Sequence, residues 1–286
     1  MNETDVIQLA RAFVARVGLT VFPIDLEACV RGANAKLKYE ALGENESGTT
    51  LRRPDGVHVV IVNSLETPAR RNFTVCHEIA HIVLGLPSDH REVPPWSSAK
   101  RDPNEWMCDL FAAELVMPYT LWRMALPPEE LSRGLIEKMA SAFECSFPAA
   151  ASRYASLASH PCAYVTMSQG TVRFATMSSS LRTVGARIRL RSPVPPGSLA
   201  HRLRVDGVTG FEQGVTDQDV WFDDWEKGSE MEELSRHDAQ HDSTISLLWF
   251  PDEELPEREV GRFGIQVSSD DGGLAELDGQ LPWPRR

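Results

Sequence analysis

Two histidines and a glutamate lie close together in residues 76–81, which read CHEIAH. His77 and His81 are four residues apart, so on a helix their side chains lie about 40° apart around the axis and can reach one metal ion. Glu78 lies beside them and can take a proton from a water molecule that a zinc ion has made acidic. The HExxH pattern therefore predicts a zinc-dependent hydrolytic site with His77 and His81 as ligands and Glu78 as general base.

A catalytic zinc usually has three protein ligands and one open position, so this pattern requires a third ligand. Glu105 is the best candidate, because it lies 24 residues after His81 at the start of a second helical segment. Asp109 follows on the same helix face and can orient a ligand histidine through its other ring nitrogen. Glu114, on a different face of that helix, and His90, in the intervening loop, remain as alternatives.

The segments around these residues are predicted from apolar spacing and turn residues. The predicted helices cover residues 4–17, 23–32, 67–84 and 104–116. Thr4 is the expected N-cap of the first helix, and Gly85 is expected to end the third. Strands are predicted over 35–39 and, most clearly, over 57–63. The helical context, the preceding strand and the downstream carboxylate favour a zinc site over a surface or core histidine pair.

Three parts of the chain differ in their residue patterns. Residues 1–125 carry the zinc pattern and are predicted to form a metallopeptidase domain, and residues 126–159 are predicted as short helices in a helix-turn-helix-like arrangement. In residues 160–286, apolar and polar residues alternate as they do in strands. We expect a hairpin at Gln169-Gly170, a strand over 242–250 and an acidic tail. The expected fold class is α+β, with a helical segment between two domains.

Composition limits the classes of partner and compartment. Residues 201–286 hold 21 acidic and 8 basic side chains, so the net charge of −12 comes from this part of the chain. Because nucleic-acid binders usually carry a basic patch, we expect a protein or peptide partner rather than direct nucleic-acid binding. The five cysteines show no CxxC spacing, and neither a signal peptide nor a long apolar stretch is present. We therefore expect a cytoplasmic protein outside the membrane.

The two motifs together resemble those of the ImmA/IrrE zinc metallopeptidases. NFTVCHEIAHIVLG, residues 72–85, is similar to the HExxH helix of that family, and EWMCDLFAAELVMP, residues 105–118, is similar to its ExxA(N/D)xFAAxLLMP helix. The resemblance covers residues 1–158. Ala80 replaces the common glycine of HELGH, and Cys108-Asp109 replaces Ala-Asn, but neither difference removes a ligand.

The resemblance implies a function as well as a fold. It implies a zincin-like, gluzincin-type site with Zn²⁺ held by His77, His81 and Glu105. It also implies a substrate, because several members cleave an XRE-type helix-turn-helix repressor and so switch on a stress or mobile-element response. Residues 160–250 are similar in length and strand texture to a GAF-like sensor domain. The alternative is a non-catalytic zinc-containing regulator or an immunity component that acts by protein or DNA binding.

Two further predictions concern the substrate and the arginines. We expect the substrate to lie as an extended strand along residues 57–63, and Tyr39, Tyr119 and His90 are candidates to stabilise the oxyanion. The arginines of residues 161–200, a stretch without acidic side chains, are expected to pair with the acidic segment 217–233 rather than with DNA or an anionic signal.

Overall fold

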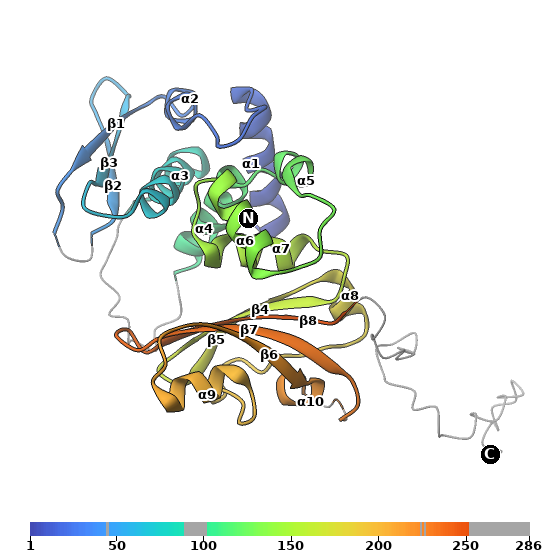
Figure 1. Ribbon diagram of the computed structural model, residues 1–286. Coiled ribbons are helices and arrows are strands. Elements are labelled where there is room, and N and C mark those ends of the chain that lie inside the picture. Colours follow the sequence, from blue (N-terminus) through green and yellow to red (C-terminus); the bar gives the residue numbers. More distant parts are fainter. Residues whose placement is uncertain (44–45, 89–101, 224, 226, 252–286) are drawn as a thin grey trace, which may run out of the picture. The chain divides into compact units, whose positions relative to one another are not determined.

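The computed structural model divides the chain into two compact units, Met1–Tyr154 and Ala155–Arg286 (Figure 1). It describes residues 1–43, 46–88, 102–223, 225 and 227–251. None of the helices in these residues is long and apolar enough to cross a membrane. The finer division at residues 125 and 159 stays a prediction.

The first unit combines helices with a small mixed sheet. Its helices are α1 (Glu3–Val17), α2 (Leu26–Gly32), α3 (Pro68–Leu84), α4 (Pro103–Val116), α5 (Tyr119–Ala125), α6 (Arg133–Ala142) and α7 (Phe147–Leu157), the last of which crosses the unit boundary. Its strands are β1 (Ala35–Glu40), β2 (Gly48–Arg52) and β3 (His58–Asn63). The sheet order is β1-β3-β2, with β1 parallel and β2 antiparallel to β3. This mixture confirms the predicted α+β class.

Local side-chain chemistry sets the ends of these helices. The N-cap of α1 is Asn2 and not Thr4, because the side chains of Asn2 and Asp5 each accept a hydrogen bond from the backbone of the other. Helix α2 begins at Leu26, later than predicted, because Asp25 caps it. Helix α3 ends as predicted at Gly85, whose φ of 66° is left-handed.

Helix α3 is the central element of the first unit. It contacts β2 and β3 of the sheet as well as α2 and α4 (Figure 1). Its residues from Thr74 to His81 are buried, and Phe13 of α1 packs edge-to-face on Phe111 of α4 with ring centroids 5.9 Å apart. Any polar side chain in the middle of α3 is therefore held in a packed environment, between the sheet and α4.

The second unit is built on an antiparallel sheet. Its elements are β4 (Cys162–Ser168), β5 (Thr171–Met177), α8 (Ser179–Thr183), α9 (Leu199–Asp206), β6 (Gly210–Asp217), α10 (Gln218–Trp221), β7 (Glu230–Asp238) and β8 (Ser243–Trp249). The sheet order is β5-β4-β8-β7-β6, and α9 and α10 lie on the same face of it (Figure 1). The predicted hairpin is confirmed, because Gln169 and Gly170 join β4 to β5 with φ values of 51° and 68°.

The arginines of residues 161–200 have different surroundings. Arg189 forms the predicted type of ion pair, with Asp223 at 3.1 Å. The other arginines are exposed and form no ion pair with a carboxylate in the described part of the chain; they are Arg173, Arg182, Arg187 and Arg191. Within the described residues, which leave out positions 224 and 226 of the acidic segment, the predicted pairing holds for one arginine of the five.

Candidate metal centre

The HExxH residues lie in the buried middle of α3. Thr67 caps the helix at its start and Pro68 occupies the first turn, so the helix begins about two and a half turns before the motif. His77, Glu78 and His81 are all buried, with Glu78 only 1% exposed. Buried polar side chains in a packed helix require partners, and those partners come from α4 and from the sheet.

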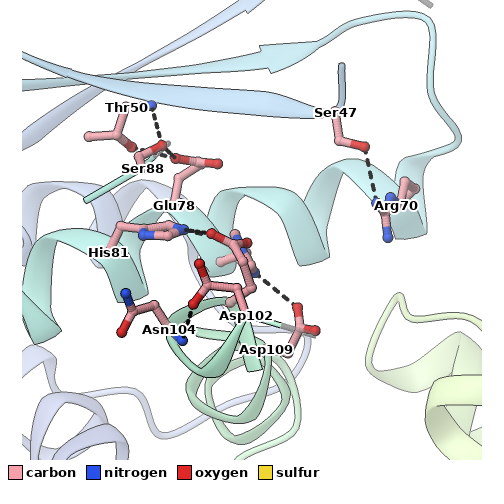
Figure 2. Close-up of polar contacts among 11 residues, drawn as sticks. Ser47, Thr50, Arg70, Glu78, His81, Ser88, Asp102, Asn104 and Asp109 are labelled. Carbon is pink, nitrogen blue, oxygen red and sulfur yellow. Dashed lines mark hydrogen bonds and ion pairs between the residues drawn. The ribbon is translucent and has the colours of Figure 1, made fainter. Parts of the chain in front are cut away.

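Potential ligand atoms of three residues converge between α3 and α4. Nε2 of His77 lies 3.1 Å from Nε2 of His81 and 3.1 Å from Oε2 of Glu105. Nε2 of His81 lies 3.6 Å from Oε1 of Glu105. Figure 2 shows His81 and Asp109 in this region, with Glu78 on the side of the sheet. The structure therefore brings together His77, His81 and Glu105, the three residues predicted as metal ligands.

The spacing of these atoms fits a metal ion. Ligand atoms about 2.0–2.1 Å from a tetrahedral zinc lie about 3.3 Å from one another. The two Nε2 atoms lie 3.1 Å apart, and each lies near a different oxygen of Glu105, at 3.1 Å for His77 and 3.6 Å for His81, so the separations scatter around that value. Two imidazole nitrogens and a carboxylate oxygen are also a ligand set that zinc accepts. The residues present therefore fit a zinc ion in both chemistry and geometry.

Asp109 contacts the far side of the His77 ring. Its Oδ1 lies 3.0 Å from Nδ1 of His77, so an Nδ1–H group can donate to it and leave the Nε2 lone pair facing Glu105. Burial lowers the pKa of His77, but hydrogen bonds to Asp109 and Glu105 outweigh burial and raise this pKa to about 9. A proton and a metal ion compete for the same lone pair of His77.

Glu78 faces the sheet through one of its oxygens. Oε2 accepts hydrogen bonds from Oγ1 of Thr50, at 2.7 Å, and from Oγ of Ser88, at 3.0 Å (Figure 2). Thr50 lies on β2, and Ser88 follows the end of α3. Sequence reasoning did not identify either residue. Their proximity to Glu78 depends on how β2 packs against α3, and no local pattern carries that information.

Glu114, the alternative third ligand, has other partners. It forms ion pairs with Arg11 at 3.0 Å and with Arg153 at 2.6 Å, and it accepts a hydrogen bond from the backbone of Tyr119. This buried carboxylate connects α1, α4 and α7. His90, the other alternative, lies outside the described residues.

The two candidate oxyanion tyrosines each lie against an arginine. The guanidinium of Arg71 lies over the Tyr39 ring at 5.6 Å, and that of Arg11 lies over the Tyr119 ring at 4.7 Å. Neither tyrosine forms a hydrogen bond with His77, His81 or Glu105 within the residues that the structure describes. His90 is again outside the described residues, so the donor stays unassigned.

The predicted substrate strand is wrong. Residues 57–63 contain β3, which pairs with β1 on one side and with β2 on the other. Both edges of β3 are therefore occupied by strands, and no peptide can be added to it. The strand beside α3 with an open edge, one that pairs with no other strand of the described residues, is β2 instead, and Thr50 of β2 contacts Glu78.

Comparisons with known proteins place this geometry in a family. No curated protein matches the chain. Among solved structures, a Mycobacterium tuberculosis transcriptional regulator has a similar fold, with a TM-score of 0.57 and 14% identity over 86% of this chain and 76% of that chain. At this identity the similarity is one of fold alone. Residues 34–154, which contain all of the predicted ligands, match the peptidase M78 family, described as the IrrE N-terminal-like domain. This part of the chain is therefore a member of the metallopeptidase-like, zinc-associated peptidase M78 family.

Proposed function

We propose that the first unit is a zinc-dependent endopeptidase. His77, His81 and Glu105 hold the ion, Glu78 is the general base, and Asp109 orients the His77 ring. The observation that carries this proposal is the convergence of the three ligand atoms, all within 4.8 Å of one another, beside the HExxH glutamate. A purely structural zinc site is closed by four protein ligands and has no use for a base, whereas three ligands leave a position open.

Each residue has a separate task in peptide hydrolysis. Zinc, when bound, supplies Lewis acidity that makes a water molecule acidic and polarises a peptide carbonyl. Glu78 takes the proton from the attacking water and passes it to the nitrogen of the leaving amine. Its burial at 1% exposure keeps bulk water away from this proton transfer. Asp109 accepts from Nδ1 of His77 and so increases the electron density on the nitrogen that binds the metal.

The open edge of β2 supports a binding mode for an extended peptide. The backbone N–H of Asn63 donates to the carbonyl of Ser47, and that of Arg53 donates to the carbonyl of Val57. Pairing alternates along an antiparallel ladder, so the peptide groups of Gly48, Thr50 and Arg52 face away from β3. A substrate strand added there would run beside Glu78, because Thr50 lies next to its carboxylate.

We propose a helix-turn-helix repressor of the XRE type as the substrate. The family match and the fold shared with a transcriptional regulator support a role in transcription. Cleavage of such a repressor would switch on a stress or mobile-element response. Because a repressor acts on DNA inside the cell, this substrate also requires a cytoplasmic protease.

A non-catalytic regulator is the second candidate. The shared fold covers 86% of this chain, and the similar protein is itself a transcriptional regulator. In that case zinc would stabilise the fold or be a signal that the protein senses, and the protein would act by binding a partner. Glu78 distinguishes the two functions, because only the peptidase needs a carboxylate beside the metal ligands.

The test mixes the full chain with a repressor encoded next to it and follows both by mass spectrometry. The zinc-loaded wild type should cut the repressor at a defined bond, whereas Glu78→Gln and the chelator-treated wild type should leave it intact. Cleavage that is equal in wild type and Glu78→Gln would exclude the proposed base. Zinc binding with stable association and no cleavage would favour the non-catalytic regulator.

A further inference from the structure

The carboxylate of Glu78 is held from the side of the sheet by hydroxyl groups. Thr50 Oγ1 donates to Oε2 of Glu78 at 2.7 Å, and Ser88 Oγ donates to the same oxygen at 3.0 Å (Figure 2). A buried carboxylate has few water molecules around it, so these hydroxyls take over part of its solvation. By holding Oε2, they also fix the rotation of the carboxylate and the direction in which Oε1 points.

A glycine lets Thr50 approach Glu78. Gly48 and Thr50 are two residues apart on β2, so both positions face the same side of the sheet. A Cβ atom at Gly48 would lie 2.6 Å from Cγ2 of Thr74 on α3 and 2.9 Å from the backbone oxygen of Ile61. Because backbone atoms cannot rotate away, a larger residue would displace β2 from its packing position. Gly48 therefore sets the distance between β2 and the helix that carries Glu78.

The two hydroxyl donors differ in how they respond to a bound peptide. The backbone N–H of Thr50 is at the open edge of β2 and donates to Oγ of Ser88 at 3.3 Å. A peptide strand added to β2 would need this same N–H, so it competes with Ser88. The Thr50 side chain takes no part in strand pairing and keeps its hydrogen bond to Glu78. Thr50 is therefore the donor that remains while substrate is bound.

We propose that Thr50 is a positioning residue that orients Glu78 for proton transfer, at a distance set by Gly48. This inference rests on the proposed peptidase function. Among the described residues, Thr50 forms no hydrogen bond with His77, His81 or Glu105, and it acts through Glu78. Its replacement should therefore leave metal binding intact and weaken only those steps in which Glu78 must accept a proton.

The test measures zinc content and the binding of a peptide hydroxamate to the zinc-loaded full chain by calorimetry. A hydroxamate gives up a proton when it binds a zinc site, and the general base accepts that proton. All variants should bind zinc as the wild type does. The affinity for the hydroxamate should fall about 100-fold in Glu78→Gln and about 10-fold in the isosteric Thr50→Val, because a hydrogen bond to a charged group is lost.

Three variants serve as controls for this measurement. Thr50→Ser keeps the hydroxyl and should stay within about twofold of the wild type. Ser88→Ala should lose less affinity than Thr50→Val, because a bound peptide takes the Thr50 N–H from Ser88 and loosens its position. Gly48→Ala keeps the hydroxyl but displaces β2, so it should reproduce the loss seen in Thr50→Val. It provides a second route should Thr50→Val fold poorly.

The outcomes separate this inference from the proposed function. Wild-type affinity in Thr50→Val together with weak binding in Glu78→Gln would overturn the role of Thr50 and leave the peptidase proposal standing. An equal loss in Ser88→Ala and Thr50→Val would overturn the distinction between the two donors. Wild-type affinity in Glu78→Gln would overturn the base itself, and the positioning role with it.

Discussion

Each unit holds a carboxylate in a polar cluster, but the partners of the two carboxylates differ in kind. In the second unit, Glu233 is 0% exposed and accepts hydrogen bonds from five described donors. They are the backbone amides of Leu199 and Ala200 and the side chains of Thr216, Trp221 and Ser235. In the first unit, Glu105 faces the Nε2 atoms of His77 and His81. The cluster around Glu233 matches an acceptor with donors, whereas the cluster around Glu105 directs potential ligand atoms at one another.

This difference separates a structural cluster from a candidate metal site. Donors around Glu233 satisfy its charge, and two of them are the first amides of α9, where a negative charge is stabilised by the helix dipole. Converging lone pairs repel unless they share a proton or a cation. Glu114, which pairs with Arg11 and Arg153, is a structural carboxylate of the same kind as Glu233. Burial of a carboxylate alone therefore does not mark a functional site, and the type of partner does.

Loss of one converging ligand should have the largest effect. His81→Ala should lower zinc affinity by about 1,000-fold, because zinc binding of about 10–16 kcal/mol is shared by only a few ligands. Competition with a chromogenic chelator measures this affinity. His241→Ala replaces an exposed histidine of the second unit and should bind zinc as the wild type does. Equal zinc affinities in His81→Ala and His241→Ala would contradict the assignment of His81 as a ligand.

Disruption of the matched cluster should reduce stability and leave zinc affinity unchanged. Glu233→Gln brings an amide group against donors that have lost their charged acceptor, so the free energy of unfolding should fall by about 3 kcal/mol. Urea unfolding of the full chain measures it. Glu232→Gln, the neighbouring position on the other face of β7, is the matched control and should change stability by less than about 1 kcal/mol. A change in zinc affinity in Glu233→Gln would contradict the separation of the structural cluster at Glu233 from the candidate metal site.

A smaller change should follow from the contact behind His77. Asp109→Asn keeps an oxygen near Nδ1 but removes its charge, so zinc affinity should fall by about 10–100-fold. The same chelator competition measures it, with Glu137→Gln, an exposed carboxylate paired with Arg133, as the control. A stability loss without a change in zinc affinity would make Asp109 a structural residue like Glu233.

The smallest effect is expected at a partly exposed charge pair. Both nitrogen contacts of Arg204 to Asp242 are 2.9 Å, and this hydrogen bonding holds the pKa of Asp242 below its ordinary value. The pair therefore stabilises the fold above the unfolded pKa of about 3.9, and this contribution is lost as the pH falls through the lower folded pKa. Asp242→Asn should cost about 0.5 kcal/mol at pH 7 and nothing near pH 2. Urea unfolding at both pH values checks it, and an equal cost at each pH would exclude a charge effect.

The candidate site was predictable where it depends on local spacing. The HExxH residues and Glu105 share helices that apolar periodicity identifies, so their faces follow from the sequence. Thr50 and Gly48 were not predictable, because their role depends on β2 lying against α3. The choice of residues 57–63 as the substrate strand failed for the same reason. Strand order is a property of the whole sheet, and β3 is its central strand.

The second unit shows the same limit. The hairpin at Gln169-Gly170 was predictable from turn chemistry. The role of Glu233 was not, although alternation along β7 puts it on one face with Met231 and Ser235. From sequence, a glutamate in a strand reads as a solvent-facing residue. Its burial depends on donors from α9, β6 and α10, which lie 12 to 34 residues away.

The central claim is that the atoms converging between α3 and α4 hold a metal ion. Anomalous diffraction at the zinc absorption edge, from crystals of the zinc-loaded full chain, tests it most directly. We predict a peak about 2.0–2.2 Å from Nε2 of His77, Nε2 of His81 and a carboxylate oxygen of Glu105, with no peak at Glu233. The absence of a peak among these three residues, or a peak elsewhere in the chain, would contradict the claim.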